Sequence, residues 1–178
     1  MQACVCPLRA ALPSARSHVI FWATAAAGTA ADLFTKSAVH AWLAQLPQRE
    51  YSVIDGLLKL VIRENSGAAF SIAQGQRTAL VAISVVAMLI LLGVFFFGRV
   101  RKAVTAVVLG LLAAGILGNL YDRAFNDGLV RDFIEVYRGS WRWPAFNVAD
   151  SLLCVAMGLV IVQQVIAAFS QRPAHPRK

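Results

Sequence analysis

The sequence predicts a mainly α-helical membrane protein with four transmembrane helices and a small extracytoplasmic β-sheet. Three observations support this fold class. First, 58% of the 178 residues are hydrophobic and 15% are charged, whereas soluble domains carry about 25% charged residues. Second, the hydrophobic residues gather in runs close to the ~20 residues that cross a bilayer as a helix. Third, the basic residues are divided unequally between the polar segments that separate these runs.

Four apolar runs are candidates for the transmembrane helices, at residues 18–35, 78–98, 103–121 and 146–169. The second and third contain no charged residue and lack the polar stripe that a long helix of a soluble protein shows. Small residues in the third run, from Gly110 to Gly118, suit close helix packing in lipid. The first run has an alternative interpretation as a cleaved secretory signal, because a basic tail precedes it and Ala-x-Ala-like sites lie near Ala25–Ala31.

The distribution of Lys and Arg predicts the orientation of the helices. The two tails and the 99–102 loop contain eight basic residues and no acidic residue, while the rest of the chain contains nine of each. Basic residues concentrate in cytoplasmic loops, so both termini should lie in the cytoplasm. The expected organisation is a four-helix membrane domain at 18–170, cytoplasmic tails at 1–17 and 171–178, and outward-facing segments at about 36–77 and 122–145. The basic residues form no basic aromatic face, so we do not expect a nucleic-acid partner.

The first outward-facing segment predicts a β-hairpin between about residues 51 and 63. Asp55-Gly56 lies between two apolar stretches there, and this dipeptide is typical of a hairpin turn. Asn65 and Gly67 should then form a turn that leads from the sheet to the second apolar run, with Gly67 allowing close backbone approach. The alternative is an ordinary turn at the end of a strand.

Two groups of polar residues lie at the outward ends of the predicted helices. Asp32 and Lys36 are spaced i, i+4 and can form an ion pair on one helix face. Asn119, Asp122 and Arg123 stack at the end of the third run, where an Asp122–Arg123 pair would fix the helix end and orient Asn119. A neutralised ion pair near the interface explains Asp32 and Lys36 as readily as a functional role does.

Two further carboxylates are harder to explain as solvated surface charges. Asn126-Asp-Gly128 is typical of a turn, which would return Asp132 towards the membrane surface among apolar neighbours. Asp150 lies about one turn inside the fourth run, with Asn147 on the same face and no basic residue before Arg172. Ionisable groups in such places tend to be functional.

Asp132 and Asp150 together suggest hydrolysis by an aspartate pair. Two neighbouring carboxyl groups in an apolar setting share one proton, so that one can activate water and the other can polarise a carbonyl group. This chemistry needs no metal or cofactor, and the dispersed cysteines and histidines offer no metal-ligand spacing. Two alternatives are a transporter or proton relay built on the same acids, and a membrane assembly factor without chemistry.

Five motifs occur in order along the chain: Asp32-x-x-x-Lys36, Asn65-x-Gly-Ala-Ala-Phe70, Gly118-Asn-x-x-Asp-Arg123, Val130-x-Asp132-Phe and Phe146-Asn-x-Ala-Asp150. Together with four spans of this orientation, they resemble the bacterial lipoprotein signal peptidases, also called signal peptidase II. The resemblance covers about residues 18 to 170 and leaves out only the tails.

The resemblance implies a membrane aspartyl endopeptidase with Asp132 and Asp150 as its catalytic pair. The substrates would be diacylglyceryl-modified prolipoproteins, cleaved on the N-terminal side of the lipidated cysteine, and globomycin would inhibit the enzyme. It also implies a location in the bacterial cytoplasmic (inner) membrane, in contact with membrane lipids and with the active site near the outer face. The residues that would bind substrate or support the pair are Asp32, Lys36, Asn65, Gly67, Asn119, Asp122, Arg123 and Asn147.

Two features qualify or extend the resemblance. Members of this family commonly have Val-Val-Asp where this chain has Val130-Arg131-Asp132, so the charge beside the pair differs unless Arg131 points away along an extended segment. Residues 137–144 predict an interfacial loop in which Trp141 and Trp143 lie at headgroup depth. This loop either forms a plain aromatic belt or helps to close over the acyl chains of the substrate.

Overall fold

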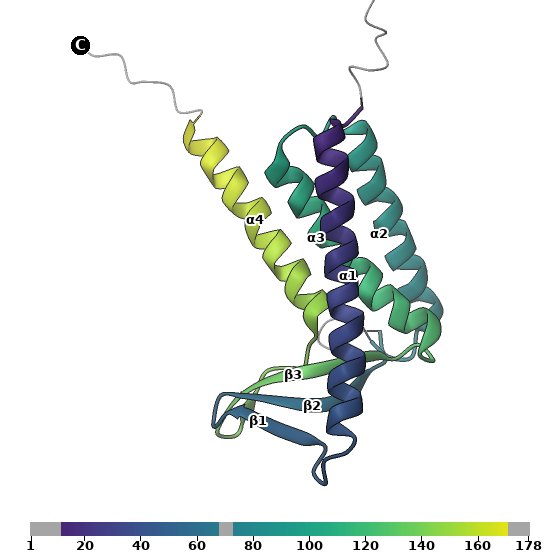
Figure 1. Cartoon of the computed structure of the whole chain (residues 1–178), viewed down its shortest axis with the longest axis vertical. Coiled ribbons are helices and arrows are strands. Elements are labelled where there is room, and N and C mark those ends of the chain that lie inside the picture. The colour runs from purple at the N-terminus through teal and green to yellow at the C-terminus, as the bar shows by residue number, and fades with distance from the viewer. Residues whose placement is uncertain (1–11, 68–72, 171–178) are drawn as a thin grey trace, which may run out of the picture.

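The computed structural model describes residues 12–67 and 73–170, which form four helices and a small antiparallel sheet (Figure 1). The predicted tails at 1–17 and 171–178 therefore lie largely outside the described residues, as do Ala68–Phe70 of the second motif. The elements are, in order, α1 (Ala15–Leu43), β1 (Glu50–Ile54), β2 (Leu58–Asn65), α2 (Arg77–Phe97), α3 (Ala103–Phe125), β3 (Val130–Arg138), β4 (Trp141–Arg142) and α4 (Val148–Ser170).

The helix α3 lies at the centre of the bundle and contacts each of the other three helices. Small residues allow these contacts, because a Cβ added to Gly110 would meet Thr24 and the backbone of Phe21 on α1. A Cβ added to Gly115 would meet Leu153 and the backbone of α4 in the same way. The small-residue pattern predicted for close packing is thus used on two faces of α3.

Three of the described helices, α2, α3 and α4, are long and apolar enough to cross a membrane. The helix α1 is longer, at 29 residues, but is less apolar because it carries residues such as Asp32 and Lys36. The predicted boundaries of the second to fourth runs agree with the helices to within a few residues. The first helix extends past its predicted end at residue 35 to Leu43. Three of the four predicted spans therefore have the required length and composition, and the first span, which corresponds to α1, stays a prediction.

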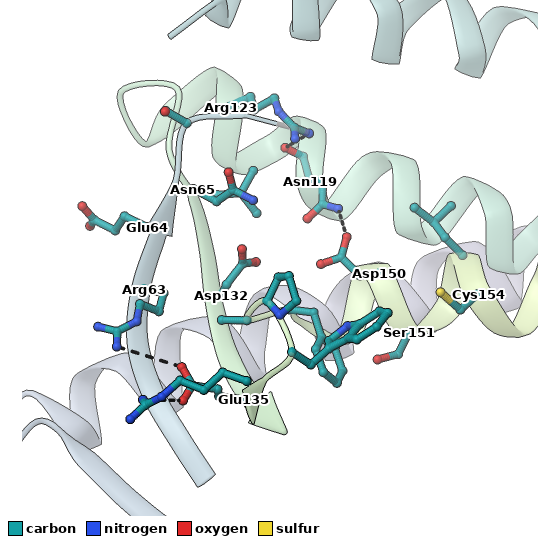
Figure 2. A pocket seen from close by; sticks show the side chains of 18 of the residues that line it. Arg63, Glu64, Asn65, Asn119, Arg123, Asp132, Glu135, Asp150, Ser151 and Cys154 are labelled. Carbon is teal, nitrogen blue, oxygen red and sulfur yellow. Dashed lines mark hydrogen bonds and ion pairs between the residues drawn. The ribbon is translucent and has the colours of Figure 1, made fainter. Parts of the chain in front are cut away.

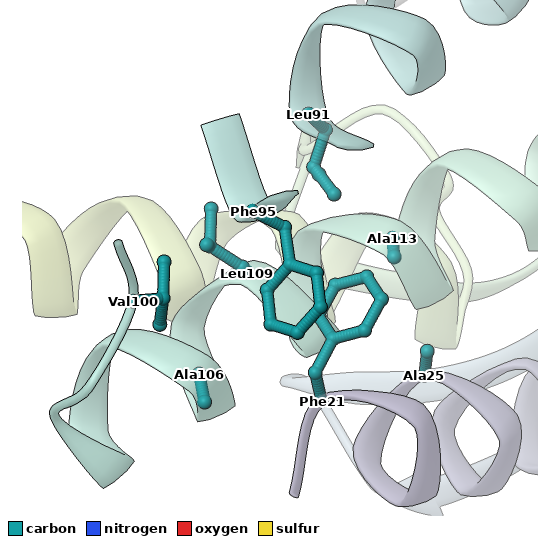
Figure 3. Close-up of a cluster of buried hydrophobic side chains, with 8 residues drawn as sticks. All are labelled: Phe21, Ala25, Leu91, Phe95, Val100, Ala106, Leu109 and Ala113. Carbon is teal, nitrogen blue, oxygen red and sulfur yellow. The ribbon is translucent and has the colours of Figure 1, made fainter. Parts of the chain in front are cut away.

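A cluster of buried apolar side chains joins α1, α2 and α3 at the end of the bundle far from the sheet (Figures 1 and 3). Phe21 and Phe95 are fully buried and stack with their ring centroids 4.1 Å apart. Ala25, Leu91 and Ala113 surround the two rings. Such packing aligns the helices, whose opposite ends carry the polar residues singled out above.

The sheet has the order β1-β2-β3-β4 and lies beside the end of α1 and the start of α4 (Figure 1). The predicted hairpin is confirmed: β1 and β2 pair antiparallel around the Asp55-Gly56 turn, where Gly56 has a φ of 75°. The strands β3 and β4 were not predicted as parts of the sheet. The segment at Asp132 was interpreted as a chain return, with an extended conformation at Arg131 as one possibility, and residues 137–144 as an interfacial loop. β3 forms because it pairs with β2, a contact between segments that are distant in sequence.

Candidate active site

The sheet and the helix ends border a partly open cavity of about 960 Å³ (Figure 2). Its walls come from β2, β3, the segment that precedes α4, and the facing ends of α3 and α4. Asp132 and Asp150 both line it, as the sequence analysis anticipated. Other predicted site residues that line it are Asn65, Asn119 and Arg123.

Backbone pairing explains how β3 and the start of α4 come together. Phe133 and Ile134 both donate backbone hydrogen bonds to the Phe146 carbonyl, at 3.1 and 2.9 Å, and Phe146 donates one to Ile134 at 3.0 Å. The chain enters α4 immediately afterwards, so Asn147 arrives beside Asp132. The side-chain Nδ2 of Asn147 donates to Asp132 Oδ1 at 2.7 Å.

The Asp132 side chain is 3% exposed and sits on β3 with its carboxyl group in the cavity (Figure 2). The pKa of this carboxyl group is raised to about 7, mainly by burial and secondly by the negative charge of Asp150. Hydrogen bonds from Asn147 and Asn65 and the charge of Lys36 act in the opposite direction and do not cancel the effect. Asp132 is therefore partly protonated at neutral pH.

Asp150 lies in the first turn of α4 and forms a reciprocal cap with Asn147. The Asn147 backbone N–H donates to Asp150 Oδ2 at 3.2 Å, and the Asp150 backbone N–H donates to Asn147 Oδ1 at 3.0 Å. This is the geometry of a capping box, with an Asn at the N-cap and an acid three residues later. A carboxylate at this place also interacts favourably with the helix dipole.

The Asn119 side chain connects the two carboxylates to the charged residues behind them. Its Nδ2 donates to Asp150 Oδ1 at 2.8 Å (Figure 2). Its Oδ1 accepts from Asn147 Nδ2 and from Lys36 Nζ, each at 3.1 Å. Because every polar atom of this amide is used, the orientation of Asn119 is fixed, and with it the position of the Asp150 carboxylate.

The predicted Asp32–Lys36 pair is confirmed, with both side chains fully buried and 2.7 Å between Lys36 Nζ and Asp32 Oδ2. Lys36 also lies 3.3 Å from Asp122 Oδ2. Asp32 Oδ1 accepts from the Ala149 backbone N–H at 2.7 Å. The pair thus joins α1 to the first turn of α4, one residue before Asp150.

The predicted Asp122–Arg123 ion pair is wrong. Arg123 instead donates to the carbonyl of Gly67 at 2.9 Å and to that of Asn119 at 3.5 Å. Asp122 is held by Lys36 and by Arg131, whose Nη2 lies 2.6 Å from Asp122 Oδ1. Neighbouring residues on a helix point in different directions, so a contact between Asp122 and Arg123 is geometrically unfavourable.

The predicted turn at Asn65 and Gly67 is confirmed within the described residues. Asn65 Oδ1 accepts from the Gly67 backbone N–H at 2.9 Å. The Gly67 carbonyl in turn receives the guanidinium group of Arg123, which anchors the end of β2 to α3. Asn65 is thereby held over the cavity, near Asp132 (Figure 2).

The sequence analysis missed an ion-pair network at the rim of the cavity. Glu135 on β3 is 4% exposed and receives Arg142 Nη1 at 3.0 Å and Lys59 Nζ at 3.3 Å, with Arg63 Nη2 at 4.0 Å. These contacts join β2, β3 and β4 (Figure 2). No spacing rule within one element reveals them, because they depend on the register between strands.

Comparison with known proteins connects this geometry to a family. The family model described as "Signal peptidase (SPase) II" matches residues 24–166, which include every motif singled out in the sequence. The chain belongs to the signal peptidase II family. Membership makes it a peptidase, and its long apolar helices agree with a membrane protein.

Individual relatives and solved structures agree with this membership. A lipoprotein signal peptidase from Rhodopirellula baltica is 38% identical over 169 residues, which cover 86% of this chain and 74% of the relative. One from Sulfurihydrogenibium is 39% identical over 136 residues, covering 73% and 81%. The fold is similar to that of a bacterial membrane enzyme solved by the in meso method, with a TM-score of 0.73 and 26% identity over 90% of this chain and 94% of that one.

Proposed function

We propose that this member of the signal peptidase II family is an aspartyl endopeptidase that removes the signal peptide from diacylglyceryl-modified prolipoproteins. It would cleave on the N-terminal side of the lipidated cysteine. The observation that carries this proposal is the placement of Asp132 and Asp150 on one cavity, joined by the side chain and backbone of Asn147. The names of the relatives, lipoprotein signal peptidases, support the substrate class.

In the proposed reaction the two carboxyl groups hold one proton between them. Asp132, whose pKa is raised to about 7, is the better place for that proton, and Asp150 is then the base. The Asp150 carboxylate takes a proton from water as the oxygen attacks the scissile carbonyl carbon, while the Asp132 proton stabilises the developing oxyanion. When the tetrahedral intermediate collapses, the C–N bond breaks and the amine leaves with a proton from the pair. The pair returns to its singly protonated state.

The other predicted residues have supporting roles in this proposal. Asn119 and Asn147 orient the two carboxylates through the hydrogen bonds described above. Arg123 supplies the nearby positive charge and holds the Gly67 carbonyl, which keeps Asn65 over the cavity. Asp32, Lys36 and Asp122 form the buried charges beneath the site. No metal or cofactor is required.

We further propose that α1 is a fourth transmembrane helix and that both termini are cytoplasmic. Twenty-nine residues of helix span about 44 Å, which is enough to cross a bilayer. Asp32 and Lys36 neutralise each other, so their presence does not prevent insertion. The start of α1 and the end of α4 lie at the same end of the molecule, opposite the sheet (Figure 1). The sheet and the cavity would then face the outer surface of the inner membrane, in contact with membrane lipids.

Labelling tests this topology in whole cells. A cysteine introduced at Gly139, which lies in the exposed turn between β3 and β4, should react with a membrane-impermeant maleimide, in a background where the native cysteines are serine. A cysteine at Arg101, in the short segment between α2 and α3, should react only after the membrane is opened. The reverse pattern would overturn the proposed orientation.

The cleavage test uses a diacylglyceryl-modified prolipoprotein in detergent or lipid without added metal. Asp132→Asn and Asp150→Asn should each abolish release of the signal peptide. Asp127→Asn is the matched control, because Asp127 lies exposed in the turn before β3 and undergoes the same chemical change. Retained cleavage in either cavity variant would refute the pair. Globomycin should inhibit the wild-type protein in the same assay.

The same assay separates the peptidase from the alternatives. Proton or ion flux across vesicles without any cleavage of lipidated substrates would favour a transporter. Full function of a folded protein that lacks both carboxylates would favour an assembly factor.

A further inference from the structure

Behind the cavity, four charged side chains from three elements form a buried cluster: Asp32 and Lys36 on α1, Asp122 on α3 and Arg131 on β3. The first three are fully buried and the Arg131 side chain is 20% exposed. Two acids face two bases, so the cluster is formally neutral. In a setting of low dielectric constant, removal of one member leaves an uncompensated charge.

Arg131 holds Asp122 with both its side chain and its backbone. Its Nε and Nη2 lie 3.1 and 2.6 Å from Asp122 Oδ1. Its backbone N–H donates to Asp122 Oδ2 at 3.0 Å. Its Nη1 also donates to Ser37 Oγ on α1 at 3.1 Å. The beginning of β3 is therefore attached to α3 and α1 immediately before Asp132.

The direction of the Arg131 side chain separates it from the substrate cavity. Successive residues of a strand point to opposite faces of the sheet. Asp132 points into the cavity, whereas Arg131 points to Asp122 and does not line the cavity wall. Any effect of Arg131 on the reaction must therefore pass through the position or the electrostatic surroundings of Asp132.

We propose that Arg131 is a positioning residue for peptide hydrolysis, which neutralises Asp122 and fixes the start of β3 so that Asp132 is presented correctly to Asp150. This inference rests on the proposed function of the aspartate pair. It assigns a role to a residue outside the cavity. It also predicts that the pH dependence of kcat shifts in opposite directions when the cluster gains a negative or a positive charge.

The net charge of the cluster can be changed in both directions. Arg131→Gln leaves the cluster with one excess negative charge, because Asp32 and Asp122 then share Lys36. Asp122→Asn leaves one excess positive charge. The double variant is neutral again, with Asp32 and Lys36 as the remaining pair. The backbone hydrogen bond from residue 131 can form in all three, since a carboxamide oxygen also accepts.

Other charged and titratable groups around Asp132 are unchanged in these variants. They come from every element that packs against it: Lys36 and His40 on α1, Arg63 and Glu64 on β2, Arg123 on α3, Glu135 on β3 and Asp150 on α4. Comparison among the variants therefore isolates the charge at positions 122 and 131.

The test measures kcat and KM against pH for cleavage of a lipidated prolipoprotein by folded protein. An added negative charge makes Asp132 harder to ionise, so in Arg131→Gln the alkaline limb of the kcat–pH profile, where kcat falls as pH rises, should move to higher pH. The expected shift is about half to one pH unit, the size expected for one charge at an effective dielectric constant of about 20. Asp122→Asn should move the limb to lower pH. The double variant should return it close to the wild-type position.

The expected KM of Arg131→Gln is close to that of wild type, because Arg131 does not line the cavity. Arg131→Lys should keep the wild-type limb while losing part of kcat, since it preserves the charge but not the two-pronged contact. Arg138→Gln is the matched control, because Arg138 is exposed at the far end of the same strand. It should leave the pH profile unchanged.

Shifts of the same sign in both single variants, or no shift in either, would overturn the inference. A raised KM with unchanged kcat in Arg131→Gln would also overturn it, by showing contact with substrate. If Arg131→Gln fails to fold, Asp122→Asn and the neutral double variant decide together. A shift to lower pH in Asp122→Asn that the double variant reverses supports the inference, and no shift in Asp122→Asn or a shift that persists in the double variant refutes it. The proposed function is judged separately, because it fails if the wild-type protein does not cleave the lipidated substrate or if Asp132→Asn or Asp150→Asn retains cleavage.

Discussion

Replacement of Asp132 by Asn should abolish cleavage and at the same time stabilise the protein above neutral pH. The reason is that the folded protein holds this carboxyl group in an environment that opposes its ionisation. Asn has nearly the same shape and can still accept the hydrogen bond from Asn147 that now reaches Asp132 Oδ1 at 2.7 Å. The substitution therefore removes the titration of the side chain while keeping its packing.

The size of the effect follows from the pKa of Asp132, which burial and Asp150 raise from 3.8 to about 7 in the folded protein. Below about pH 4 the group is protonated in both the folded and the unfolded protein, so it does not affect stability. Between the two pKa values only the unfolded chain ionises fully, and stability falls as pH rises. Above pH 7 the full difference applies, which corresponds to an upper bound of about 4 kcal/mol.

Thermal unfolding in detergent at pH 4, 6 and 8, followed by tryptophan fluorescence, measures this effect. At about 2–4 °C per kcal/mol for a chain of this size, the bound of about 4 kcal/mol means that Asp132→Asn should raise Tm by at most roughly 8–16 °C at pH 8, and by very little at pH 4. Asp127→Asn, in an exposed turn, should show no gain that grows with pH. A gain that does not change with pH would show that folding does not shift the pKa of Asp132, and a loss that is largest at pH 8 would show that the fold stabilises its carboxylate. Either result would refute this reasoning.

Three further perturbations follow from the same geometry. Lys36→Met would leave Asp32 without its cation and Asp122 with Arg131 alone, so it should lower the free energy of unfolding by about 3–5 kcal/mol; chemical denaturation measures this, and a loss below 1 kcal/mol would contradict it. Gly118→Ala would place a methyl group against the Asp32 carboxylate that accepts from Ala149, and should reduce both Tm and activity, whereas Gly93→Ala, which meets nothing within 4 Å, should not. Combined replacement of Trp141 and Trp143 by Ala should raise KM for lipidated substrate if the loop closes over the acyl chains; unchanged KM would leave the aromatic belt as the explanation.

The sequence was most informative where an interaction lies within one element. Asp32 and Lys36 meet because helical spacing places them on one face. Asn147 and Asp150 were expected on one helix face; their spacing also fits the cap that the structure shows, an Asn followed three residues later by an acid, although this cap was not predicted. The hairpin turn at Gly56 was predictable because Asp55-Gly56 is a local turn signal between two apolar stretches.

Interactions between distant segments were less accessible from the sequence. Arg131 was recognised as unusual, but its partner Asp122 belongs to another element. Asp122 was instead expected to pair with Arg123, which is adjacent to it in the sequence. The strand β3 was missed because charged residues at 131, 132 and 135 interrupt the alternation of apolar and polar residues that identifies a strand. In the folded protein Asp132 and Glu135 point to polar partners instead, so tertiary contacts replaced the hydrophobic pattern.

The charges around the proposed aspartate pair are consistent with one shared proton. Arg123 is buried and interacts with Asp150 and Asp132. The cluster that contains Arg131 is neutral, so the balance depends on Arg123 and the pair. With one proton on the pair, its single negative charge matches Arg123 and the sum is zero. Two protons leave one excess positive charge and none leaves one excess negative charge, and both states are disfavoured where charges are poorly solvated. The chemistry that we propose would use this same singly protonated state, in which one carboxylate activates water and one carboxyl group donates its proton.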